Sequence, residues 1–204
     1  MTKVYTSRHH RKGTLSRRNV PTRGMPVGVE SPTEVAATVV VKLIEIAGRR
    51  AECIPDLSAA VRRAVDELDP EGVRDSSPTW WQDLPPGQYL DPFDRVRRAH
   101  DQLLVLEVQA NDVVQDLRGF LSLTPAGGPG RPFGYSPARA HAVLERMALR
   151  RAEMLSDMGR AVRMLQPQLS KETAAALRSG IRAVADEESR AQVERVRLTE
   201  LLSA

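Results

Sequence analysis

Three charged residues occupy positions where a helical apolar stripe calls for hydrophobic side chains, namely Glu107, Arg151 and Glu188. If the helices that carry them fold back on one another near residues 129 and 168, both glutamates come within about one turn of Arg151. Because an unpaired buried charge is costly, this spacing predicts an ion cluster. The cluster could form a polar site inside the bundle, or its ion pairs could fix the register of the helices. Alternatively, the long side chains could extend their charged ends to water at the interface between helices.

Residue patterns typical of catalysis or metal binding are missing from the sequence. No Glu-x-x-His pair of the kind used by di-metal bundles occurs, and His100 and His141 would lie roughly 27 Å apart in the expected hairpin. The single Cys53 excludes an internal disulfide, and neither a phosphate-binding glycine loop nor a nucleophile elbow is present. We therefore expect no metal, no cofactor, no catalytic residue and no enzymatic activity.

A second kind of chemistry is suggested by the charge distribution. The net charge of the 204 residues is +4, but seven of the 30 basic residues precede Glu30 without any acidic residue among them, which leaves 23 basic against 26 acidic residues in the remainder. Residues 1–29 thus carry a charge of +7, and residues 30–204, counted from Glu30, carry a charge of −3, so the sequence divides into a basic arm and a slightly acidic body. The basic residues of the arm are Lys3, Arg8, Arg11, Lys12, Arg17, Arg18 and Arg23.

We expect this arm, residues 1–30, to be flexible, because glycine and proline interrupt it and no apolar period runs through it. A flexible basic segment can follow the phosphates of nucleic acid. An acidic protein or an assembly surface would attract it as well, and some basic tails have no dedicated partner.

The body, residues 31–204, has the periodicity of helices throughout. Ser31-Pro32-Thr33-Glu34 has the spacing of a capping box, which is typical of a helix start. Glycine is common at the end of a helix and proline in the first turn of the next one, so Gly48 and Pro55 indicate a break between them. We therefore expect two short helices within residues 31–68. Residues 69–91 form a connector rich in proline and aromatic residues. We expect no strand.

Residues 92–204 predict three long helices with near-heptad apolar stripes. Asp91, Ser136 and Ser170 are suitable N-caps for them, and the segments 124–136 and 167–169 separate them. The short break at 167–169 requires the last two helices to be antiparallel, and the longer segment 124–136 permits the same arrangement for the first two. The fold class is therefore all-α, an elongated antiparallel bundle of three long and two shorter helices with a flexible basic N-terminal arm.

Aromatic residues gather in the connectors, where Trp80, Trp81 and Tyr89 could anchor a protein interface or close the end of the core. The near-heptad stripes also favour a homo-oligomer. A twin-arginine motif at Arg17-Arg18 is not followed by an uncharged apolar run, and no segment is apolar enough to span a bilayer. We expect a cytoplasmic protein with no membrane contact.

These patterns favour a non-enzymatic helical interaction or assembly protein whose basic arm contacts nucleic acid or a nucleoprotein. The alternative is a structural subunit of a multi-protein assembly, virion-like or otherwise, in which the arm extends across neighbouring subunits. An enzyme or a metal-binding bundle is the third hypothesis.

Overall fold

The computed structural model describes residues 32–72, 90–123 and 136–203. These residues form four helices, and no strand occurs among them, which confirms the all-α class. The helices are α1 (Pro32–Leu68), α2 (Pro92–Leu123), α3 (Pro137–Leu165) and α4 (Lys171–Ser203). The predicted basic arm, most of the 69–91 connector and the 124–135 segment lie outside the described residues.

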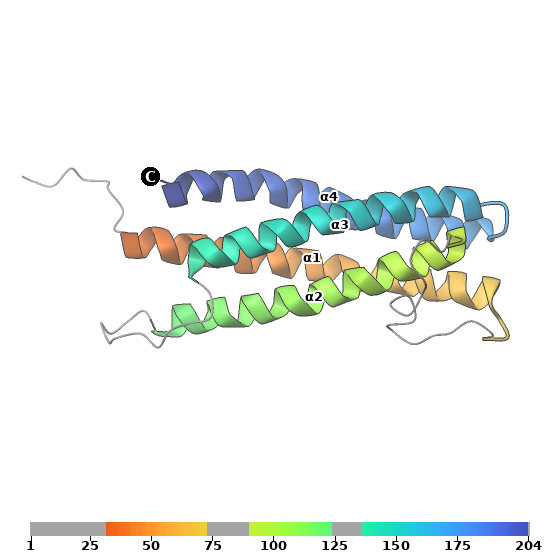
Figure 1. Ribbon diagram of the computed structural model, residues 1–204, viewed down its shortest axis with the longest axis horizontal. Helices are drawn as coiled ribbons and strands as arrows, with labels where there is room; N and C mark the ends of the chain where they lie inside the picture. The colour runs from red at the N-terminus through yellow and green to blue at the C-terminus, as the bar shows by residue number, and fades with distance from the viewer. Residues whose placement is uncertain (1–31, 73–89, 124–135, 204) are drawn as a thin grey trace, which may run out of the picture. The chain divides into compact units, whose positions relative to one another are not determined.

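Successive helices run in opposite directions, and each one packs against its neighbours in the chain, with α4 returning to α1 (Figure 1). Ion pairs mark the alignment of the helices: Arg49 of α1 bonds to Glu187 of α4, and Arg95 of α2 bonds to Asp157 of α3. α1 and α4 approach closely at Gly180, where an added Cβ would lie 2.9 Å from the Leu57 Cα. Only glycine fits at this position without a shift of the backbone.

Side-chain caps start three of the helices where the sequence predicts them. The Asp91 carboxylate accepts a hydrogen bond from the Asp94 amide at 2.8 Å. The Ser136 and Ser170 hydroxyls accept from Arg139 and Thr173, at 3.3 and 3.1 Å. Each cap satisfies a first-turn donor that has no partner within its own helix, so these boundaries are set locally.

The prediction of two short helices over residues 31–68 is wrong, because α1 continues through both Gly48 and Pro55. A proline inside a helix removes one backbone hydrogen bond and disfavours the helical conformation of the preceding residue. Here Pro55 lies on the exposed side of α1, where water can reach the carbonyl group that it leaves unpaired. The neighbouring side chains of Ile54 and Leu57 are buried and hold the helix against the core, and this packing outweighs the local cost.

The apolar core consists of two clusters along the helices. One is built around Leu57, Leu103, Met158 and Leu177, and the other around Leu43, Leu117, Leu144 and Leu198. All four helices contribute to both clusters. The turn of each helix that lies between the clusters carries charged side chains, and these form the candidate site.

Candidate functional site: a charged layer within the bundle

Five charged side chains meet between the two apolar clusters, at least one from every helix. We call them the charged layer; its members are Arg50 of α1, Glu107 of α2, Arg151 of α3, and Glu188 and Arg195 of α4. All are buried except Glu107, whose side chain is 15% exposed. Every helix thus places a charge at the same level of the bundle.

Arg151 lies at the centre of the layer and is fully buried. Its Nε donates to Glu188 Oε1 at 2.6 Å, while its Nη1 lies 3.6 Å from Glu107 Oε1, beyond hydrogen-bond range. Nη1 and Nη2 have no hydrogen-bond partner among the described residues. Burial lowers the pKa of Arg151, and the nearby charge of Arg50 lowers it further, against the opposing effect of Glu188 and Glu107. An arginine nonetheless stays protonated.

The other two arginines complete the layer from either side. Arg50 Nε donates to both carboxylate oxygens of Glu107, at 2.9 and 3.0 Å, and lies 3.9 Å from Glu188 Oε1. Arg195 Nη2 donates to Glu188 Oε2 at 3.0 Å and also bonds to the side chain of Gln192. Three guanidinium groups therefore share two carboxylates, so the layer has a formal charge of +1.

The structure brings together the three residues of the predicted ion cluster, Glu107, Arg151 and Glu188. Sequence reasoning missed Arg50 and Arg195, although both occupy core positions of a helical stripe. Arg195 lies four residues after Ala191 and three before Leu198, so the spacing already places it on the apolar stripe of its helix and could have predicted its burial. Arg50 continues the spacing of buried Leu43 and Ile46, at steps of three and four residues. The expectation that a helix ends at Gly48 prevented its assignment to the same apolar stripe.

Two grooves flank the charged layer on opposite seams of the bundle. The groove between α1 and α2 has a volume of about 440 Å³, and Arg50 and Glu107 contribute to its wall. The groove between α3 and α4 has a volume of about 590 Å³, and Glu188 and Arg195 contribute to its wall. The side chains of the charged layer thus extend from the wall of one groove to the wall of the other.

Both described histidines are engaged in structural contacts. His141 Nε2 bonds to the Arg195 carbonyl oxygen at 3.1 Å. His100 Nε2 bonds to Ser58 Oγ at 2.9 Å, but its Nδ1 lies 3.7 Å from the Asp101 carboxylate, which is too far for the hydrogen bond that orients a catalytic triad. Among the residues that the structure describes, no group of three His, Cys, Asp or Glu side chains could hold a metal ion.

The remaining predicted site residues lie outside the described residues. They are the seven basic residues of the arm, Lys3, Arg8, Arg11, Lys12, Arg17, Arg18 and Arg23, and the proposed interface anchors Trp80, Trp81 and Tyr89. Their roles stay predictions. None of the described helices is long and apolar enough to cross a membrane.

No family model matches the chain, and neither a curated protein nor a solved structure shows significant similarity to it.

Proposed function

We propose that the protein is a non-enzymatic helical interaction protein of the cytoplasm, in which a four-helix bundle carries a basic N-terminal arm that contacts nucleic acid. The observation that carries this proposal is the segregation of charge: seven basic and no acidic side chains precede Glu30, while the rest of the chain is net negative. When a segment of unopposed positive charge neutralises phosphates, the counterions condensed on the nucleic acid are released, and this release drives binding.

The surface of the bundle supports the assignment of binding to the arm. Arg139, Arg146 and Arg150 are exposed along α3, but the exposed Glu153 follows them on the same helix and adds a negative charge to this surface. A mixed surface of this kind attracts a polyanion far less than the arm does. We therefore expect the arm to supply most of the affinity, with little sequence preference, since phosphate contacts carry no base information.

Deletion of residues 1–30 tests the proposal. The affinity of the full chain for a DNA duplex and for single-stranded RNA is measured by fluorescence anisotropy over a range of salt concentrations. Seven neutralised phosphates give a slope of log K against log salt of up to about −6 on duplex DNA. We expect the deletion to remove this slope, and the replacement of Arg8, Arg11, Lys12, Arg17 and Arg18 by glutamine to reduce it strongly.

A matched control replaces Arg139, Arg146 and Arg150 by glutamine, which removes exposed charge from the bundle and leaves the arm intact. We expect this variant to bind as the full chain does. The proposal fails if the full chain shows no salt-dependent binding near physiological ionic strength, or if the control loses as much affinity as the arm variants.

The exposed apolar side chains of the helices favour a second candidate function, that of a subunit in a protein assembly. Val108 of α2, Leu149 of α3 and Val193 of α4 are each more than half exposed. Apolar side chains in water favour burial against another protein surface, including that of a second copy. Light scattering over a range of concentrations tests this candidate, which predicts a mass above that of one chain that falls when Val108 and Val193 are replaced by serine.

A further inference from the structure

The groove between α1 and α2 combines an apolar wall with two arginine side chains that have unused hydrogen-bond donors. Ile44, Ala47 and Ile54 form much of the wall on α1, and Val114 extends it on α2. Its volume of about 440 Å³ falls within the range of small-molecule sites, which are mostly apolar with a few convergent polar groups.

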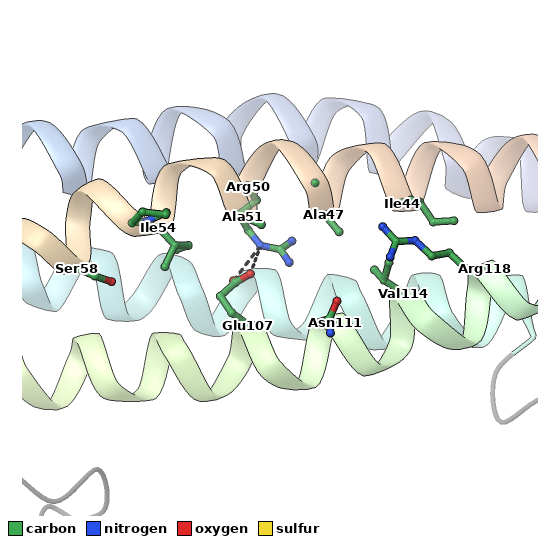
Figure 2. Close-up of a pocket in the computed structure, with 12 residues that line it drawn as sticks. Ile44, Ala47, Arg50, Ala51, Ile54, Ser58, Glu107, Asn111, Val114 and Arg118 are labelled. Atoms are coloured by element: carbon green, nitrogen blue, oxygen red, sulfur yellow. Dashed lines mark hydrogen bonds and ion pairs between the residues drawn. The ribbon is translucent and has the colours of Figure 1, made fainter.

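Arg50 is the buried polar group at one side of this groove. Only 3% of its surface is exposed, and its Nε is fixed by Glu107. The two Nη groups have no hydrogen-bond partner among the described residues and point into the groove (Figure 2). A rigidly held guanidinium with two unused donors is well suited to bind a carboxylate or phosphate oxygen.

Arg118 enters the same groove from further along α2. Its guanidinium points back toward Arg50, and Asn111 lies between the two (Figure 2). In the described part of the chain, no hydrogen bond or ion pair engages this guanidinium. Within the groove two arginines therefore face one glutamate, and the charged layer behind it adds a further excess positive charge.

From this geometry we infer a binding site for a small amphipathic anion in the groove between α1 and α2. The anionic head group lies between Arg50 and Arg118 with Asn111 as an additional donor, and the apolar body covers Ile44, Ala47 and Ile54. The charge selects for an anion, and the apolar wall selects for a hydrocarbon body. This inference concerns the bundle alone and does not depend on the arm or on nucleic acid.

Isothermal titration of the full chain with decanoate tests the site, and decanol serves as the uncharged comparison. The two probes have the same hydrocarbon chain, so a difference between them reports the head group. We expect one decanoate per chain, with decanol binding at least about tenfold more weakly because it lacks the charge-assisted hydrogen bonds. Equal binding of the two probes would overturn the inference.

Two variants locate the site without disturbing the charged layer. Arg118→Gln removes an exposed charge, and we expect decanoate affinity to fall by about tenfold. Gly48→Leu fills the groove, because a Cβ at Gly48 meets nothing within 4 Å and the longer side chain extends from there. We expect this variant to lose decanoate binding while it keeps its helical circular dichroism, since leucine favours a helix more than glycine does.

Gly159→Leu is the matched control, because Gly159 also has open space around its Cβ but lies on α3, outside this groove. We expect it to bind decanoate as the unmodified chain does. Full decanoate binding by a folded Gly48→Leu variant, or equal losses in the two glycine variants, would contradict the assignment of the site.

Discussion

Arg151 is held at the centre of the bundle by fewer hydrogen bonds than its guanidinium can donate. It is fully buried, and Nη1 and Nη2 have no hydrogen-bond partner in the described residues. The carboxylates around it do not depend on it alone, because Glu107 also bonds to Arg50 and Glu188 also bonds to Arg195. Removal of Arg151 therefore leaves neither carboxylate of the charged layer without a guanidinium partner.

We expect Arg151→Met to unfold at the same urea concentration as the parent protein or a higher one, with a gain of up to about 2 kcal/mol. The methionine fills a similar volume, and the two remaining arginines balance the two glutamates. In contrast, Glu188→Gln leaves Arg151 and Arg195 without their shared carboxylate, and we expect a loss of about 3 kcal/mol.

Equilibrium urea unfolding followed by circular dichroism measures both variants. A loss of stability in Arg151→Met as large as that in Glu188→Gln would show that the layer depends on all three arginines. Loss of nucleic-acid or decanoate binding in a stable Arg151→Met variant would instead assign this residue a role in function.

At the scale of the elements, one side chain joins the end of α1 to the start of α4. Glu67 accepts hydrogen bonds from the Ser170 amide at 2.9 Å, from the Ser170 hydroxyl at 2.8 Å and from the Thr173 hydroxyl. The bond from Thr173, followed by those from Ser170, lowers the pKa of Glu67. A negative charge at the N-terminus of α4 also interacts favourably with the helix dipole.

Because the pKa of Glu67 is lower in the folded protein than in the unfolded chain, its contribution to stability is complete above its unfolded pKa. The contribution disappears as the pH falls through the folded pKa. We expect Glu67→Gln to melt a few degrees below the parent protein at about pH 7, and the difference to shrink steadily as the pH is lowered below the ordinary pKa of glutamate. Thermal melts of both proteins over a series of pH values measure this, and a difference that does not depend on pH would contradict it.

The helices illustrate which element boundaries local chemistry determines. The starts of α2, α3 and α4 follow from Asp91, Ser136 and Ser170, whose side chains satisfy first-turn amides, and these were predictable. The continuity of α1 through Pro55 was not predictable from the sequence. Its local signals favour a break, and only the burial of Ile54 and Leu57 against other helices outweighs them.

At the scale of the whole bundle, within residues 32–203 as the structure describes them, the charged layer separates two apolar clusters, but the four continuous helices connect them. Damage to one cluster should therefore destabilise the other. We expect Leu117→Ala, in the fully buried core of one cluster, to lower the free energy of unfolding by about 3 kcal/mol. Native-state hydrogen exchange should then show an equal loss of protection in the slowest amides near Leu57 and Leu177, in the other cluster.

Leu177→Ala provides the reciprocal measurement, since Leu177 is equally buried in the second cluster. Loss of protection confined to the cluster that carries the substitution, in either variant, would show that the charged layer divides the bundle into two units that unfold separately.

The sequence by itself determined the all-α class, three helix starts and the separation of a basic arm from an acidic body. These depend on local periods, on caps and on the count of charges. It also predicted that Glu107, Arg151 and Glu188 would meet, because short connections and a constant helical rise fix which residues oppose one another. Only the tertiary structure decided that α1 is continuous and that Arg50 and Arg195 complete the layer. It also placed Arg118 opposite Arg50 in a groove, because such contacts depend on packing between helices distant in sequence.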